Sequence, residues 1–345
     1  MRRSIIIGTG AVGGTIGGQL AAHGRPVVWV ARGEHGATLR AKGLTLHTPG
    51  GTVRASAPVW SGPDEASLQG GDVLVLATKT NAAEAAAREW ADLPVAGGGT
   101  AGERLPILVC TNGLAAEDLV LRYFARVYGV CVWCPATFLA PGEIIARFGP
   151  RSASLHVGRV PAALTDAADA TLLAALKAGW ESANLEVTLP EDVMPWKARK
   201  LVTNMGNAVD ALLGPAADRG RREALVRGLE AEAYAVMADA GVAVTPDADE
   251  AAARASGPSI QPVDQFDPAT MGVSSTWQSL VKGGDLETDF LNGEIVRLAH
   301  AAGIAAPRNT AICRLARAAA RTGARPGDVG VGDLEAALLV EADRG

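Results

Sequence analysis

An uncharged, glycine-rich stretch near the N-terminus constrains the fold of this chain more than any other feature. It opens with Ile5-Ile6-Ile7, a β-branched run typical of a buried parallel strand, and Gly8-Thr9-Gly10-Ala11-Val12-Gly13 follows directly. A helix is expected from 11 to about 23, ended by Gly24, before a second apolar strand at 26–31. This order predicts a βαβ unit with G-x-G-x-x-G at its strand-to-helix turn.

The glycine spacing predicts a dinucleotide site. Gly8 would allow a tight turn, Gly10 would let the backbone approach a pyrophosphate, and Gly13 would let helix and strand pack closely. The pyrophosphate would lie at the helix N-terminus, where free N–H groups and the helix dipole favour anions. The expected cofactor-binding residues of this loop are Gly8, Thr9, Gly10, Ala11, Val12 and Gly13. The alternative is a tightly packed turn that binds no ligand.

The end of the second strand bears on which dinucleotide binds. An NAD site usually has Asp or Glu there to bind the ribose 2′-hydroxyl, whereas this chain has Arg32. A guanidinium can pair with a 2′-phosphate, so Arg32 favours NADP(H). The alternative is a solvated Arg32, with Glu34 as the residue that binds the ribose.

The chain has two regions that differ in predicted secondary structure, which indicates two domains. Apolar strands alternate with helices in the first region, and the second reads as helices without a convincing strand. We therefore expect an α/β fold with an N-terminal Rossmann-type domain over 1–189 and an all-helical domain over 190–345. One continuous helix is expected over 191–213, an irregular connection over 245–268, and a slack surface loop at Gly97-Gly98-Gly99.

Composition excludes several classes of function. The 345 residues favour two domains, and a net charge of −5 gives no reason to expect binding to nucleic acid or an anionic membrane. Four cysteines are too few for a disulfide scaffold, and five histidines show no metal-ligand spacing, so no metal is expected. The glycines argue against a signal peptide or membrane helix at the N-terminus, so a cytoplasmic location is expected.

Polar side chains at strand ends and along one helix are candidates for ligand contact. Lys79 and Asn112 each follow a predicted strand, where ligands bind in open α/β sheets. A solvated lysine and an ordinary Asn-Gly turn are the alternatives. Lys200, Asn204 and Asn207 have the spacing i, i+4, i+7 and share one face of a continuous helix. Such a lysine could protonate an oxygen and an asparagine could hold a substrate, although a solvated polar stripe would look the same.

Taken in order, these motifs resemble the ketopantoate reductase (2-dehydropantoate 2-reductase) family over 5–311. The resemblance rests on seven segments: Gly8–Gly14, Val30–Gly33, Thr78-Lys79, Thr111-Asn112-Gly113, Lys200-Leu201-x-x-Asn204, Ser274-Ser275 and Glu287-x-Asp289-x-x-Asn292-Gly293. It implies a Rossmann-type domain, a helical domain and an active site in the cleft between them. It also implies NADPH-dependent reduction of 2-dehydropantoate to pantoate, as in pantothenate biosynthesis.

The resemblance also implies roles for individual residues. Lys200 would be the general acid at the 2-oxo oxygen, and Glu287 would contact the substrate and support the charged lysine. Asn204 and Ser275 would bind the substrate, although in isolation Ser274 or Ser275 is typical of a helix N-cap and Glu287 of a first-turn acid. The cofactor would meet Arg32 at its 2′-phosphate, and Lys79 and Asn112 at its nicotinamide end.

Two positions depart from the family pattern. Ala208 stands where many relatives have a second asparagine, and Gly272 where they often have one before the substrate-binding serine. Asn207 could take over the first role. The departures leave open a different 2-oxo acid, ketone or imine as the substrate. A non-catalytic nucleotide sensor is also open, although the retained Lys200 and Glu287 argue against it. The helical domain could form a homodimer.

Overall fold

The computed structural model describes residues 3–267, 271, 274–281, 283 and 286–342, and the chain divides into two compact units. The first unit comprises Met1–Trp196 and Pro246–Phe266, and the second Lys197–Thr245 and Asp267–Gly345. The units thus differ in two places from the ranges expected from the sequence. The division falls seven residues after 189, and Pro246–Phe266 belongs with the first unit.

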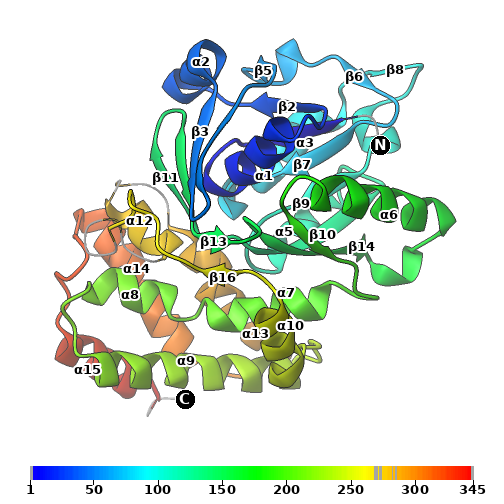
Figure 1. Cartoon of the computed structure of the whole chain (residues 1–345). Helices are drawn as coiled ribbons and strands as arrows, with labels where there is room; N and C mark the ends of the chain where they lie inside the picture. Colours follow the sequence, from blue (N-terminus) through cyan, green and yellow to red (C-terminus); the bar gives the residue numbers. More distant parts are fainter. Residues whose placement is uncertain (1–2, 268–270, 272–273, 282, 284–285, 343–345) are drawn as a thin grey trace. The chain divides into compact units, whose positions relative to one another are not determined.

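Eight strands form the main sheet of the first unit: β1 (Ser4–Ile7), β2 (Val27–Val30), β5 (Val59–Trp60), β7 (Val73–Leu76), β9 (Ile107–Val109), β10 (Val127–Trp133), β14 (Ser154–Val160) and β15 (Glu186–Thr188) (Figure 1). Their order is β15-β14-β10-β9-β7-β1-β2-β5. The six from β5 to β10 are parallel and have the connectivity of a dinucleotide-binding sheet. β14 joins antiparallel to β10.

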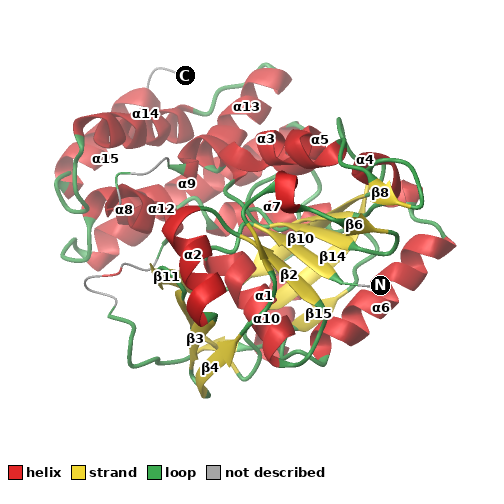
Figure 2. Ribbon diagram, turned by 90° about the horizontal axis from the view of Figure 1, so that it is seen from above, coloured by secondary structure: helices red, strands yellow, loops and turns green. Residues whose placement is uncertain are grey.

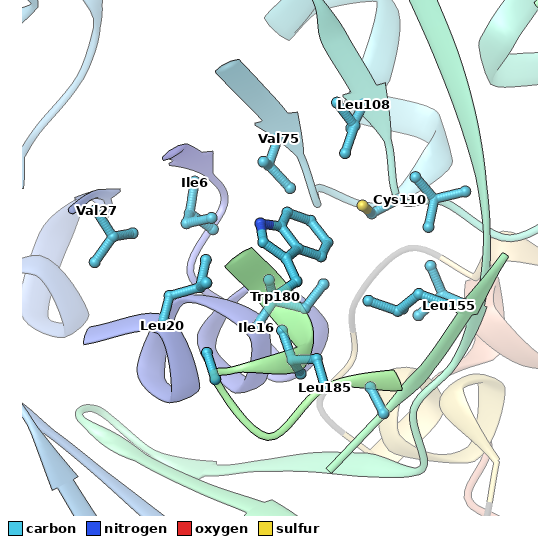
Figure 3. Close-up of a cluster of buried hydrophobic side chains, with 14 of the residues drawn as sticks. Ile6, Ile16, Leu20, Val27, Val75, Leu108, Cys110, Leu155, Trp180 and Leu185 are labelled. Carbon is cyan, nitrogen blue, oxygen red and sulfur yellow. The ribbon is translucent and has the colours of Figure 1, made fainter. Parts of the chain in front are cut away.

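Helices cover both faces of this sheet (Figure 2): α1 (Ala11–Ala22) and α6 (Ala167–Glu181) lie on one face, and α3 (Thr80–Ala91), α4 (Ala101–Arg104) and α5 (Ala115–Val120) on the other. Side chains of a strand alternate between faces, so Ile6 enters the core under α1 while Ile5 and Ile7 enter the core under α3. Figure 3 shows the fully buried Trp180 of α6 among side chains of α1 and the strands.

A second, four-stranded sheet packs against α1 and was largely missed from the sequence. Its strands are β3 (Leu44–Thr48), β4 (Gly51–Ala55), β11 (Ala136–Ala140) and β12 (Glu143–Ala146), in the order β11-β12-β3-β4. A Cβ on Gly14 would lie 2.1 Å from Ile144 Cδ1, and one on Gly18 would lie 2.6 Å from Leu44 Cδ2. These two glycines of α1 therefore permit close packing of this sheet.

Shorter elements complete the first unit: α2 (Gly33–Lys42), β6 (Leu68–Gln69), β8 (Val95–Ala96), and 3₁₀ turns at Pro63–Glu65 and Ala162–Leu164. The slack loop expected at Gly97-Gly98-Gly99 is instead a hydrogen-bonded turn. All three glycines have positive φ, Gly98 N–H donates to the Val95 carbonyl (2.9 Å), and Val95 N–H donates to the Gly99 carbonyl (3.0 Å). Glycine is needed here for its left-handed backbone conformation.

The irregular connection expected over 245–268 contains regular structure. It includes α10 (Asp247–Ser256) and β16 (Ser259–Ile260), and β16 pairs antiparallel with β13 (Phe148–Gly149). Two cation–π contacts fasten it to the first unit, with the Arg254 guanidinium 3.9 Å from the Trp133 ring and that of Arg147 4.0 Å from the Phe266 ring. Pairs so distant in sequence leave no local pattern to predict them.

The described residues of the second unit form helices: α8 (Asn207–Leu213), α9 (Arg219–Asp239), α12 (Ser275–Val281), α13 (Asn292–Ala302), α14 (Pro307–Thr322) and α15 (Val331–Ala342), with a 3₁₀ turn at Glu287–Phe290. α7 (Met194–Thr203) enters this unit from the first. An α/β domain followed by a helical domain confirms the expected fold class. The prediction of a single helix over 191–213 was wrong, because α7 and α8 are separate.

None of the described helices is long and apolar enough to cross a membrane.

Candidate active site

The glycine loop after β1 has the geometry that its spacing predicts. Gly8 has a φ of +93°, which favours glycine, and a Cβ on Gly13 would lie only 2.1 Å from the Gly8 carbonyl oxygen. A Cβ on Gly10 would meet no atom within 4 Å. The loop therefore needs glycine for its turn and its packing at two positions, while Gly10 faces open space.

The N-terminus of α1 fits an anionic group. Gly10 is the N-cap and supplies no side-chain hydrogen bond, and no acidic residue stands in the first turn. The N–H groups of the first turn, at Ala11, Val12 and Gly13, have no partner within the helix itself. Together with the dipole, this arrangement suits a phosphate better than any neutral group. The open side of Gly10 would let a pyrophosphate approach the backbone.

Arg32 lies at the N-cap of α2 and Glu34 in the first turn of the same helix. The Arg32 guanidinium forms an ion pair with Glu89 of α3 at 2.8 Å, and both side chains are exposed. An exposed pair of this kind contributes less than about 1 kcal/mol, so a phosphate dianion can displace Glu89 from Arg32. The geometry thus leaves Arg32 accessible to a 2′-phosphate and keeps Glu34 nearby.

Lys79 and Asn112 lie at the same edge of the main sheet as the glycine loop. Lys79 is the N-cap of α3, just beyond β7, and Asn112 lies three residues beyond β9. β1, β7 and β9 are adjacent parallel strands, so their carboxyl ends meet at one edge. The Thr80 hydroxyl donates to the Asn112 carbonyl at 3.2 Å and ties the two loops together.

In the second unit, Lys200 and Asn204 lie at the break between α7 and α8. Lys200 stands in the last turn of α7, and Asn204 N–H donates to the carbonyls of Lys200 (3.2 Å) and Leu201 (3.0 Å). Met205 N–H then bonds three residues back to Val202 at 3.0 Å, which tightens the chain. Lys200 and Asn204 are half-buried. Asn204 Nδ2 is buried without a hydrogen-bond partner among the described residues.

The break removes the argument that placed Asn207 on the face of Lys200. Asn207 begins α8, and its N–H bonds three residues back to the Asn204 carbonyl at 3.1 Å. A spacing of i, i+7 predicts a shared face only along one continuous helix. Its carbonyl accepts a hydrogen bond from the Ser274 hydroxyl at 3.4 Å, next to α12. The role of Asn207 toward a substrate therefore stays a prediction.

A buried polar network, which the sequence did not reveal, supports the break. Asn292 Nδ2 donates to the Met205 carbonyl (3.2 Å) and to Asn309 Oδ1 (3.0 Å). Asn309 in turn donates through its Nδ2 and its backbone N–H to Glu232, both at 2.8 Å. Asn292 and Asn309 are fully buried. Elements more than 70 residues apart thus hold the turn that carries Asn204.

Ser275 and Glu287 each lie at the beginning of a helical segment. Ser274 is the N-cap residue, because its hydroxyl accepts the Trp277 N–H at 3.2 Å. Ser275 is the first residue of α12, and its side chain lies outside the described part of the chain, as does Gly272. Glu287 is an acidic residue in the first turn of a 3₁₀ helix, as the sequence in isolation predicts, and it is buried, with 8% of its surface exposed.

Comparison with known proteins identifies relatives along most of the chain. The family models described as "Ketopantoate reductase PanE/ApbA" and "Ketopantoate reductase PanE/ApbA C terminal" match residues 4–161 and 192–320. A 2-dehydropantoate 2-reductase from Caulobacter vibrioides is 29% identical over 322 residues, which cover 91% of this chain and 98% of that protein. These matches span both units.

Solved structures give the same picture. A PanE/ApbA family ketopantoate reductase from Ralstonia eutropha has a TM-score of 0.74 at 26% identity, covering 94% of this chain and 99% of that one. D-mandelate dehydrogenase in a ternary structure with NADH and anilino(oxo)acetate also has a TM-score of 0.74, at 22% identity and the same coverage. The second match shows likeness of fold.

Proposed function

This chain belongs to the ketopantoate reductase family of oxidoreductases, and from that premise we propose that it reduces the C2 carbonyl of a 2-oxo acid with NADPH. The substrate that we favour is 2-dehydropantoate, which would become pantoate. The observation that carries the proposal is the glycine loop, whose open Gly10 and uncapped helix N-terminus fit a dinucleotide. Lys200 and Asn204 at a helix break supply the polar groups that a carbonyl substrate needs.

The first unit would hold the cofactor. Residues 8–13 would bind the pyrophosphate, Arg32 the 2′-phosphate, and Lys79 and Asn112 the nicotinamide end. When bound, NADPH supplies the hydride. The exposed guanidinium of Arg32 supports NADPH over NADH, since it can exchange Glu89 for a phosphate. The related D-mandelate dehydrogenase was solved with NADH, so the preference needs a direct test.

The second unit would bind and protonate the substrate. The Lys200 ammonium would donate a hydrogen bond to the 2-oxo oxygen, stabilise its growing negative charge and then transfer a proton to it. Asn204, with a buried Nδ2 that has no hydrogen-bond partner among the described residues, would donate to a polar group of the substrate. Ser275 would bind the substrate, and Asn207 could add a second amide. The Glu287 carboxylate would contact the substrate and favour the charged form of Lys200.

A second candidate substrate class is supported by Ala208. This residue stands where the family resemblance implies an asparagine, and it is 1% exposed and offers no polar group. Loss of one substrate-binding amide can change discrimination between substrates by orders of magnitude. A different 2-oxo acid, a ketone or an imine is therefore the alternative substrate of the same reduction.

One assay separates these candidates. NADPH oxidation would be followed with ketopantoate and with a panel of 2-oxo acids, ketones and imines of graded size. We expect the highest kcat/KM with ketopantoate. A higher kcat/KM with another compound would replace the substrate but keep the reaction. Tight NADPH binding without turnover of any compound would instead favour a nucleotide sensor.

A further inference from the structure

We propose that His35 is a positioning residue for the cofactor, holding the peptide between Thr9 and Gly10 in the orientation that a bound pyrophosphate requires. The proposal rests on the proposed function, because only a loop that binds a dinucleotide needs this orientation. No motif singled out in the sequence includes His35, which lies in the first turn of α2.

The His35 ring bridges backbone groups of two loops, one after β1 of the main sheet and one between β11 and β12 of the second sheet. Its Nε2 lies 2.7 Å from the carbonyl oxygen of Thr9, and its Nδ1 lies 3.0 Å from the backbone nitrogen of Gly142. A carbonyl can only accept and an amide N–H can only donate, so the ring must carry its proton on Nε2. Burial lowers the pKa of His35 although the hydrogen bond to Thr9 opposes the shift, which favours this neutral form.

The bond to Thr9 determines where the next N–H points. In a planar trans peptide, the carbonyl of Thr9 and the N–H of Gly10 point in opposite directions. Because His35 binds that carbonyl, the Gly10 N–H is directed away from the ring. If the peptide rotated, the carbonyl oxygen would replace the N–H and its partial negative charge would repel a phosphate. His35 therefore keeps the Gly10 N–H, the positive end of this peptide dipole, available to an anion.

The surroundings make His35 a rigid support. The Phe138 ring packs edge-on against the imidazole, with centroids 4.9 Å apart and planes at 74°. Gly142 lies in the turn between β11 and β12, and its carbonyl accepts the Thr45 N–H at 2.8 Å, which holds the residue whose N–H binds Nδ1. The Thr9 hydroxyl donates to the Val30 carbonyl at 3.1 Å, which anchors the same residue by its side chain. The ring thus holds the glycine loop in a fixed position relative to the second sheet.

Three substitutions separate the two hydrogen bonds of His35. His35→Ala removes both bonds, His35→Gln keeps a donor that can reach the Thr9 carbonyl, and His35→Asn keeps an acceptor near the position of Nδ1. The dissociation constant of NADPH would be measured by fluorescence titration on the full chain. We expect the constant to rise about tenfold in His35→Ala and His35→Asn and to stay near the wild-type value in His35→Gln. At saturating NADPH, kcat and the substrate KM should not change.

A matched control is His23→Ala. His23 caps the opposite end of α1, and its Nδ1 lies 2.9 Å from the Gln19 carbonyl oxygen, so it is also bound to backbone but far along the helix from the loop. We expect unchanged NADPH affinity. Thermal melting of each variant would show whether it folds, and the Gln and Asn variants carry the test if His35→Ala does not.

Three outcomes would overturn the proposal. Equal NADPH affinity in the folded variants would show that the loop needs no support from His35. Affinity preserved by His35→Asn but lost in His35→Gln would assign the effect to the hairpin contact at Gly142. A wild-type chain that binds no NADPH would refute the proposed function itself, and that result is visible before any substitution is made.

Discussion

The two units carry their candidate chemistry in different ways. In the first, the site consists of backbone: a turn at Gly8, an open side at Gly10 and the free N–H groups of a helix. In the second, it consists of side chains on Lys200 and Asn204, which a buried network holds from elsewhere in the chain. A site made of backbone can be predicted from the spacing of its glycines. A site made of side chains depends on supporting residues that are distant in the sequence and have no characteristic spacing.

The largest expected effect concerns the second unit. Lys200→Ala should lower kcat by about a thousandfold, because it removes the group that would stabilise and protonate the 2-oxo oxygen. Steady-state turnover measures this effect, and NADPH affinity should be unchanged because the cofactor would bind the first unit. Turnover near the wild-type value would end the proposed role of Lys200.

A pair of glycine substitutions tests the backbone site. Gly13→Ala should lower the free energy of unfolding by about 3 kcal/mol, because its Cβ would lie 2.1 Å from the Gly8 carbonyl oxygen. Gly10→Ala is the matched variant, since its Cβ would meet no protein atom within 4 Å. It should leave stability unchanged and weaken NADPH binding. Denaturant unfolding and NADPH titration measure both effects, and unweakened binding in Gly10→Ala would contradict a pyrophosphate at this position.

Asn309→Leu tests the support of the side-chain site. The substitution removes the side-chain bonds from Asn292 and to Glu232 at a fully buried position and leaves the backbone N–H bond to Glu232, so the free energy of unfolding should fall by about 2 kcal/mol. Urea denaturation measures the loss. The double variant with Asn292→Leu should lose less than the sum of the two single losses, because the residues share one hydrogen bond. Strict additivity would show that the two residues act independently.

The smallest expected effect is the choice of cofactor. Arg32→Asp should shift the ratio of KM values for NADPH and NADH by about tenfold toward NADH, because a carboxylate repels a 2′-phosphate and can bind a ribose hydroxyl. Glu89→Gln is the companion variant. It releases Arg32 from its ion pair and should strengthen NADPH binding slightly. An unchanged preference in Arg32→Asp would favour Glu34 as the ribose ligand.

Much of the fold of the first unit could be predicted from the sequence, because its strands and its glycine loop have local sequence patterns. The apolar run at β1, the glycines of the loop and the strand at β7 all fall where the sequence predicts them. The sheet of β3, β4, β11 and β12 was largely missed. It consists of two local hairpins, β3–β4 and β11–β12, and only the pairing of β12 with β3 joins segments far apart in the chain. The glycines of α1 held a signal for it, because a Cβ on Gly14 or Gly18 would lie too close to Ile144 or Leu44 of that sheet.

The second unit was readable as helical but not in its details. The segment around Lys200 has a helical pattern on both sides, so the break at Asn204 does not show in its periodicity. Asn292 donates to the Met205 carbonyl beside the break and also to Asn309, and only the folded chain brings these residues together. The catalytic role proposed for Lys200 came from the resemblance to a family, because its spacing alone could not distinguish it from a solvated lysine.

The return of Pro246–Phe266 to the first unit has a consequence for synthesis on the ribosome. Domains usually fold as units while the chain emerges, with the N-terminal one first. Here the first unit lacks β16 and the Phe266 ring until residue 266 has left the ribosome, and by then Lys197–Thr245 has also emerged. The Rossmann-type unit is therefore completed only after part of its helical neighbour has been made, and the two cannot be separated by a single cut in the chain.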